Sequence, residues 1–122
     1  MGTKMSRSKY NNRKIVIDGH KFDSKAEGEY YFELMAMLKA GVYLTVELQP
    51  KIYMTDARIL YKPDFKCTKS DGVIEYYDVK GMRTAVFQIK KRLWEYYGPG
   101  LLGIIEKKGK KFVCTEMIEG VL

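Results

Sequence analysis

Two short segments carry the residue types that could do chemistry. Asp64 follows Pro63 in the first, and Asp78 and Lys80 stand close together in the second. Both segments are rich in aromatic and β-branched residues, which favour strands. If residues 70–72 form a three-residue hairpin loop, the pairing places Asp64 opposite Asp78, and Lys80 points to the same face.

This arrangement is typical of metal-assisted hydrolysis. Carboxylates that face each other destabilise a sheet unless a positive charge lies between them, and a hard cation such as Mg²⁺ prefers oxygen ligands. An ammonium beside them stabilises charge that develops on a phosphate. The same three side chains could instead form an ordinary ion pair on an exposed sheet face. The pattern favours the site.

A third acid, Glu27, begins the first predicted helix. Ser24 and Glu27 have the spacing of a capping box, with Ser24 as the N-cap. Helical periodicity puts Glu27 on the inward stripe with Leu34, whereas Glu29 lies on a solvated flank. Glu27 is therefore either a capping partner or a site residue at the edge of the core, and the local pattern alone favours the cap.

The elements that must position these residues follow from apolar periodicity and turn signals. The second predicted helix should bury Val86, Ile89, Lys90, Leu93 and Tyr97. The fold class is α/β, a mixed sheet flanked by helices with an α-β-β-β-α-β core. The expected elements are a hairpin around 18–19, a helix from 24 to about 39, strands over 42–54 broken near 49–50, a central hairpin over 59–68 and 73–80, a helix over 84–97, a buried strand over 101–105, a basic turn over 107–111 and an edge strand over 112–115.

Composition narrows the class of protein. The chain of 122 residues suits one domain, and a net charge of +7 favours a polyanionic partner, with nucleic acid ahead of a membrane surface. Cys67 and Cys114 lack CxxC spacing, so both are expected as buried thiols of a reduced, cytoplasmic protein. The single histidine, His20, excludes a zinc finger and argues against a His-dependent hydrolase. No run is long and apolar enough to span a membrane.

The first 13 residues are basic and lack an apolar pattern. Residues 1–13 are expected to form a flexible arm, and residues 14–122 a single domain. Lys4 and Arg7 would lie along DNA phosphates in one interpretation and belong to a solvated terminus in the other. The pattern suits both equally.

Taken together, these motifs resemble the PD-(D/E)XK nuclease superfamily. Pro63-Asp64, Asp78-Val79-Lys80 and an acid near the start of the first helix occur in that order here. The phrases at 22–27, 48–50 and 78–81 are similar to small phage-encoded members related to archaeal-type Holliday junction resolvases and to transposase endonuclease subunits. The resemblance covers residues 9–106.

The resemblance implies a restriction-endonuclease-like fold and a role for each site residue. Glu27, Asp64, Asp78 and the backbone carbonyl of Val79 would hold Mg²⁺, for which Mn²⁺ should substitute, and Asp78 stands where many members have Glu. Lys80 would orient the attacking water or steady charge on the phosphate.

The resemblance also implies a substrate and an assembly. Gln88, Lys90 and Lys91 are expected DNA contacts on the second helix. The leading function is a phage-type homodimeric DNA endonuclease that resolves four-way junctions, since a twofold dimer presents two sites to two symmetric strands. The alternatives are a nuclease of the same fold acting on other branched, nicked or linear DNA, and a DNA-binding module that does not cut.

Overall fold

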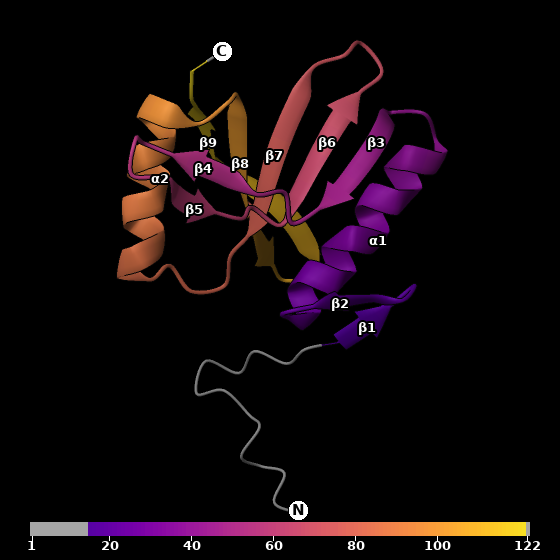
Figure 1. The fold of residues 1–122 in the computed structure, drawn as a ribbon. Coiled ribbons are helices and arrows are strands. Elements are labelled where there is room, and N and C mark those ends of the chain that lie inside the picture. The colour runs from indigo at the N-terminus through magenta and orange to yellow at the C-terminus, as the bar shows by residue number, and fades with distance from the viewer. Residues whose placement is uncertain (1–14, 122) are drawn as a thin grey trace, which may run out of the picture.

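The structure is a computed structural model that describes residues 15–121. The predicted arm over residues 1–13, with Lys4 and Arg7, lies outside the described residues. Along the chain (Figure 1) the elements are β1 (Ile15–Ile17), β2 (His20–Phe22), α1 (Lys25–Lys39), β3 (Tyr43–Leu48), β4 (Ile52–Met54), β5 (Ile59–Tyr61), β6 (Phe65–Lys69), β7 (Ile74–Val79), α2 (Ala85–Tyr97), β8 (Leu101–Lys108) and β9 (Lys111–Glu119).

The main sheet is mixed and mostly antiparallel. Its strand order is β3-β6-β7-β8-β9, and β7 and β8 form its parallel pair. Parallel neighbours need a crossover connection, which α2 supplies. The mixed α/β class and the helical crossover predicted from the sequence are confirmed. Two short hairpins, β1–β2 and β4–β5, stand apart from this sheet.

The central hairpin has the predicted register. Phe65 pairs with Tyr77 and Cys67 with Glu75, and Gly72 in the loop has φ of 91°. The same register continued by one residue places Asp64 opposite Asp78. The three-residue loop is thus confirmed, and with it the side-chain faces, because a slip of one residue would have reversed them all.

Two cores form on the two faces of the sheet. Helix α1 packs on one face, and α2 with the β4–β5 hairpin packs on the other (Figure 1). Aromatic side chains are the majority of the first core and half of the second. The first contains Phe22, Tyr30, Tyr31, Leu34, Tyr43, Phe65, Cys67, Tyr77 and Ile105, and the second contains Met54, Tyr61, Tyr76, Phe87, Trp94, Leu102, Ile104 and Ile118.

The β1–β2 hairpin packs against the first half of α1. Asp18 and Gly19 both have positive φ, as a two-residue hairpin turn requires. Gly28 permits the close approach, because a Cβ there would lie 2.5 Å from the Ile15 Cδ1 atom. This contact fixes the helix end that carries Glu27.

The boundaries of three strands differ from the predictions. The segment 59–68 is split, since β5 pairs with β4 and only β6 joins the main sheet. Pro63 lacks the N–H that a central strand needs, so the chain leaves the ladder around it. Strands β8 and β9 instead run further than predicted and leave Gly109 and Lys110 as the turn, because mutual pairing extends both strands through polar residues.

Helix α2 buries a face that overlaps the predicted one only in part, since Leu93 packs against the second core as expected. Phe87 and Trp94 are buried, whereas Val86, Ile89 and Tyr97 are 60%, 61% and 51% exposed. Apolar residues line two sides of this helix, and the larger aromatic rings occupy the core. The Trp94 indole N–H donates to the Gly100 carbonyl at 2.8 Å, which satisfies its polar atom.

One cysteine also differs from the prediction. Cys67 is buried as expected, but Cys114 is exposed because it lies on the edge strand β9. Across residues 15–121, neither helix has the length and apolar character to cross a membrane.

Candidate functional site

A cleft of about 420 Å³ brings together segments that are far apart in the sequence. It lies where α1 and α2 begin and where β7 ends. Four of the predicted site residues, Glu27, Asp64, Val79 and Lys80, line it directly. The complete lining is Asp23, Ser24, Glu27, Asp64, Val79, Lys80, Gly81, Met82 and Thr84.

Glu27 faces inward at the first turn of α1. Ser24 accepts a hydrogen bond from the Glu27 backbone N–H at 3.1 Å, so Ser24 is the N-cap as predicted. The Glu27 side chain is only 4% exposed, whereas the Glu29 carboxylate lies 2.7 Å from the Lys107 ammonium in a surface ion pair. Within the described residues, Glu27 Oε2 is buried without a hydrogen-bond partner. That oxygen is therefore available to a ligand.

Two acids of the cleft, Glu27 and Asp64, have raised pKa values. Burial raises the pKa of Glu27 to about 7, and the charges of Asp23 and Asp78 add to this, while hydrogen bonding to Asp64 opposes it. Burial also raises the pKa of Asp64 well above its ordinary value, with the charges of Asp78 and Glu27 as further causes. A desolvated group of like charges favours either protons or a cation.

Asp64 and Asp78 are held by neutral donors. The Val79 N–H donates to Asp64 Oδ2 at 2.8 Å, and the Tyr61 hydroxyl donates to Asp78 Oδ2. Asp78 is 2% exposed and lies behind the cleft wall rather than on it. Tyr61 comes from β5, so the split of segment 59–68 around Pro63 gives Asp78 its hydrogen-bond partner.

Lys80 joins the acids from the end of β7. Its ammonium lies 3.4 Å from Asp78 Oδ1 and 4.4 Å from the centre of the Phe87 ring. The Lys80 N–H donates to the Ile105 carbonyl at 2.8 Å, which fixes the backbone beside β8. The predicted alignment of Asp78 and Lys80 on one face therefore corresponds to a direct contact.

The donors of the cleft suit a hard cation in type, but they are not gathered around one point. Glu27, Asp64 and the Val79 carbonyl offer only oxygen, which Mg²⁺ prefers, and a Mg²⁺ site needs few carboxylates because the ion keeps several waters. Within residues 15–121, no three His, Cys, Asp or Glu side chains form a group that could hold a metal ion. The three-carboxylate ligand set stays a prediction.

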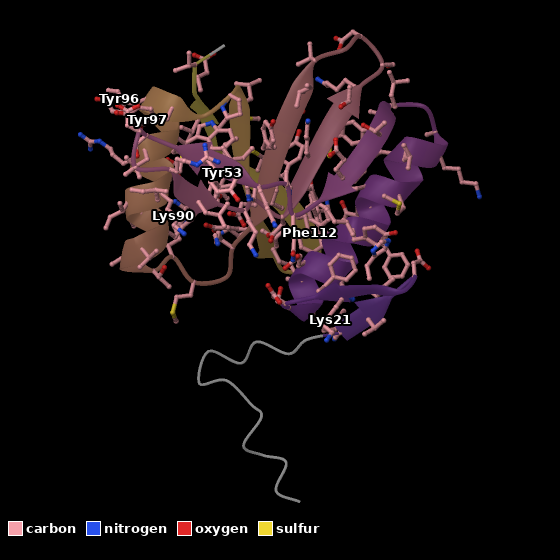
Figure 2. All side chains as sticks on the ribbon, viewed as in Figure 1. Lys21, Tyr53, Lys90, Tyr96, Tyr97 and Phe112 are labelled. Atoms are coloured by element: carbon pink, nitrogen blue, oxygen red, sulfur yellow. The ribbon has the colours of Figure 1, made fainter. Side chains whose placement is uncertain are left out.

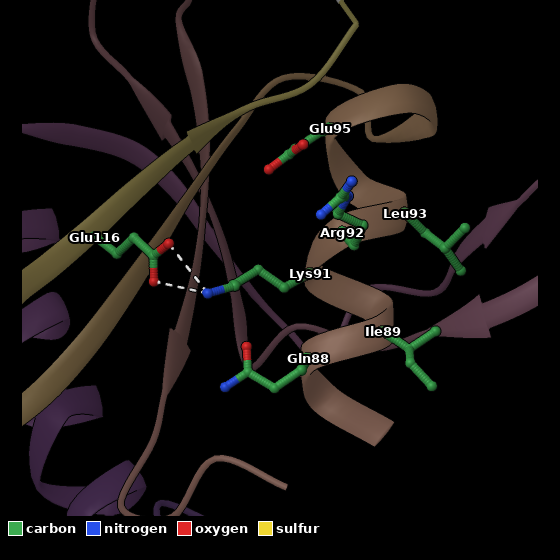
Figure 3. Close-up of a pocket in the computed structure, with 7 residues that line it drawn as sticks. All are labelled: Gln88, Ile89, Lys91, Arg92, Leu93, Glu95 and Glu116. Carbon is green, nitrogen blue, oxygen red and sulfur yellow. Dashed lines mark hydrogen bonds and ion pairs between the residues drawn. The ribbon is translucent and has the colours of Figure 1, made fainter. Parts of the chain in front are cut away.

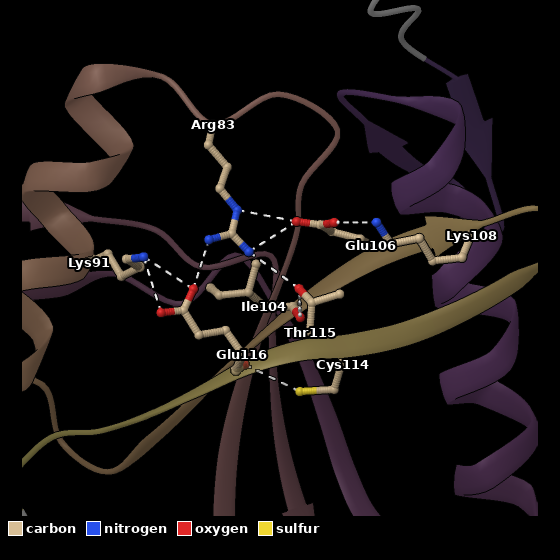
Figure 4. Close-up of polar contacts among 8 residues, drawn as sticks. All are labelled: Arg83, Lys91, Ile104, Glu106, Lys108, Cys114, Thr115 and Glu116. Atoms are coloured by element: carbon tan, nitrogen blue, oxygen red, sulfur yellow. Dashed lines mark hydrogen bonds and ion pairs between the residues drawn. The ribbon is translucent and has the colours of Figure 1, made fainter.

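An ion-pair network holds the loop that follows Lys80. The Arg83 guanidinium lies 3.0 Å from Glu106 and 2.7 Å from Glu116, and so ties the loop to β8 and β9 (Figure 4). Lys91 of α2 also pairs with Glu116 at 3.1 Å. The segment from Lys80 to α2 is thereby anchored on three elements.

The predicted DNA contacts on α2 lie apart from this cleft. Gln88 and Lys91 line a second, more open hollow of about 550 Å³, in which Lys91 points toward Glu116 (Figure 3). Lys90 is half-buried on a neighbouring side of the helix (Figure 2). Lys91 thus has an acidic partner, and the role of all three residues in binding DNA stays a prediction.

Several residues of the site were not singled out from the sequence. Asp23 and Thr84 line the cleft, Tyr61 bonds to Asp78, and the Gln49 side chain bonds to Glu27. Asp23 and Gln49 belong to the short phrases at 22–27 and 48–50, so their neighbours carried a signal. Tyr61 had none, because its role depends on the break at Pro63.

The fold and the cleft define a mixed α/β domain with buried acids and a lysine at one end of the central strand β7. Residues 7–113 match the family described as "Protein of unknown function (DUF1064)", and the chain belongs to that family. No curated protein matches the chain.

Proposed function

We propose that this protein is a metal-dependent DNA endonuclease of the PD-(D/E)XK type, with the restriction-endonuclease-like core that this type implies. The observation that carries the proposal is the convergence of Glu27, Asp64 and Lys80 in one cleft, with Asp78 directly behind them. These residues come from α1, from the start of β6 and from the end of β7. An ordinary surface ion pair would not need a buried glutamate with an unpartnered oxygen.

Each residue has a definite part in phosphodiester hydrolysis. Glu27, Asp64 and the Val79 carbonyl would hold Mg²⁺. The Asp78 carboxylate would add a further negative charge to the ligand set. The ion, when bound, supplies charge neutralisation and an activated water. Lys80 places an ammonium where negative charge grows on the phosphate, and its contact with Asp78 fixes the direction in which it points.

The net charge of +7 supports a nucleic-acid substrate. Among DNA forms we propose a four-way junction, on the resemblance of the motifs to junction resolvases. A second candidate function, a DNA-binding module that does not cut, fits the charge equally well. The buried acids oppose it, because acids that face a phosphate weaken binding and a pure binder gains by losing them.

Cleavage of end-labelled synthetic DNA tests the proposal. A four-way junction, a linear duplex of the same sequence and a single strand are each incubated with Mg²⁺, Mn²⁺, Ca²⁺ or EDTA. Cutting of the junction in Mg²⁺ and Mn²⁺ and no cutting in EDTA are expected. Equal cutting of all three DNAs would support the nuclease and reject junction selectivity, and binding without cutting in any metal would favour the second candidate.

A further inference from the structure

The turn between β8 and β9 is the most basic segment of the described chain that the proposed site does not use. Residues 107–111 contain four lysines around Gly109, and all five residues are exposed. Strand β8 runs parallel to β7, so the turn lies at the same end of the sheet as the cleft (Figure 1). The basic turn is therefore beside the acids and not on a remote face.

Two of the four lysines have acidic partners, one on α1 and one on the turn's own strand β8. Lys107 pairs with Glu29 of α1 at 2.7 Å, and Lys108 pairs with Glu106 at 3.1 Å. Phe112, the residue after the turn, packs its ring 5.3 Å from that of Tyr30. The turn is thus attached to α1 close to Glu27, mainly by the packing of Phe112 against Tyr30, because an exposed ion pair contributes little.

The other two lysines, Lys110 and Lys111, have no acidic partner within residues 15–121. Like charges so close together repel one another, and a polyanion that brings its own charges relieves the repulsion. Their ammonium groups are solvated and able to release counterions from a phosphate chain.

The turn lies within reach of a DNA backbone that is bound at the cleft. Lys80 lies level with Ile105, to which its N–H is bonded. Three further residues of β8 lead to Lys108, which is about 10 Å along the strand direction. Successive phosphates of one strand of a duplex rise by about 3.4 Å, so the turn reaches roughly three nucleotides from a phosphate held at the cleft.

We propose that the β8–β9 turn is a second binding site for the DNA backbone, in which Lys110 and Lys111 contact phosphates a few nucleotides from the scissile one. The inference rests on the proposed function for its choice of ligand. It adds a basic site on an element other than α2, at the end of the sheet where the cleft lies.

Equilibrium binding without cleavage tests this site. Fluorescence anisotropy of a labelled duplex and of a labelled junction is measured in EDTA over a series of NaCl concentrations, for wild type, Lys110→Ala, Lys111→Ala and the double variant. Each lost phosphate contact should reduce the slope of log Kd against log salt by about 0.9, so the double variant should lose up to about 1.8. Affinity at physiological salt should fall by roughly 10-fold or more.

Lys39→Ala is the matched control. Lys39 is an exposed lysine in the last turn of α1, at the other end of that helix from Glu27 (Figure 1). Its loss changes the net charge as Lys110→Ala does but removes no proposed contact, so its slope and affinity should stay at wild-type values. Thermal melting of every variant should coincide with wild type, because these side chains are solvated.

The outcomes separate this site from the nuclease proposal. Unchanged affinity and slope in the double variant, or an equal loss in Lys39→Ala, would overturn the turn site even if the wild type cuts DNA. A loss confined to the turn variants would support the site even if the wild type never cuts. Failure of the wild type to bind DNA at all would overturn the site as well.

Discussion

Glu27 and Glu29 differ in surroundings although one residue separates them. Glu27 faces the cleft and Glu29 pairs with Lys107 at the surface. Glu27→Gln keeps the shape but removes the charge that attracts a cation, so cleavage should slow by on the order of 100-fold. Glu29→Gln is the matched control and should stay within about twofold, since exposed ion pairs contribute little.

The two glutamate variants are compared by their single-turnover cleavage rates at saturating protein. Under these conditions all the DNA is bound, so a difference in affinity does not change the rate. Equal losses in both variants would contradict the assignment of Glu27 from its helical face. Equal activity in both, at the wild-type rate, would remove Glu27 from the site altogether.

The raised pKa values of Glu27 and Asp64 predict a dependence of stability on pH. Glu27 titrates near 7 in the folded protein and near 4.5 when unfolded, so the folded state holds the extra proton between those values. The free energy of unfolding must then fall as pH rises through that window, because the unfolded state binds fewer protons. Asp64, whose pKa is also raised, acts in the same direction.

Urea unfolding in EDTA at a series of pH values measures this dependence. Glu27→Gln has no proton to lose, so its stability should fall less steeply than that of wild type between about pH 4.5 and 7. Mg²⁺ should raise the melting temperature of wild type more at pH ~8 than at pH ~5.5, since protons and the ion compete for the same oxygens. Identical slopes for the variant and wild type would show that Glu27 is not the group responsible.

At the scale of elements, Arg83 determines where the loop after β7 lies. One guanidinium contacts Glu106 and Glu116, which belong to neighbouring strands. Arg83→Ala should lower the melting temperature by on the order of 5 °C and slow cleavage with little change in DNA affinity, because the loop after Lys80, which lines the cleft, loses its anchor. Arg83→Lys keeps the charge without the planar fork and should recover only part of the rate.

Lys108→Ala serves as the control for Arg83, since it also removes a partner of Glu106 but lies away from the loop. It should leave the melting temperature and the rate close to wild type. A rate unaffected by Arg83→Ala at a temperature where that variant is folded would limit the network to stability.

The elements also show which parts of the structure could be predicted from sequence patterns. The register of β6 and β7 followed from a single loop length, and it placed Asp64 and Asp78 correctly. The buried face of α2 did not follow, because Val86 and Ile89 compete with Phe87 and Trp94, and only tertiary packing selects between them. The contact of Tyr61 with Asp78 could not be predicted either, because it depends on the path of the chain around Pro63.

At the scale of the whole molecule, the exposed side of α2 presents apolar side chains at helical spacing. Val86, Ile89 and Tyr96 are at least 60% exposed, and Tyr96 and Tyr97 lie at the C-terminal end of the helix (Figure 2). A second copy of the chain carries the same stripe, so the predicted homodimer would cover both stripes at once if its twofold axis passed between the two helices.

Light scattering after size-exclusion chromatography tests this dimer. Ile89→Asp should give a monomer where wild type gives a dimer, because a charge in an apolar contact is costly to bury. Phe32→Asp, on the exposed side of α1, should remain dimeric. A monomeric wild type at all concentrations would contradict the predicted assembly, and loss of the dimer in Phe32→Asp alone would move the interface to α1.

The nuclease assignment as a whole depends most directly on Asp64. The Asp64→Asn variant keeps the shape and the backbone contacts of the side chain but removes the charge of one proposed metal ligand. Its single-turnover cleavage of a labelled four-way junction in Mg²⁺ is compared with that of wild type. Asp71→Asn is the matched control, since Asp71 is exposed in the β6–β7 turn and accepts from the Val73 N–H, which Asn also permits. We expect Asp71→Asn to cut as wild type does, and Asp64→Asn to cut about 100-fold more slowly or worse while binding the junction as tightly or more tightly. Cutting by Asp64→Asn at near the wild-type rate would contradict the assignment of this cleft as a metal-dependent nuclease site.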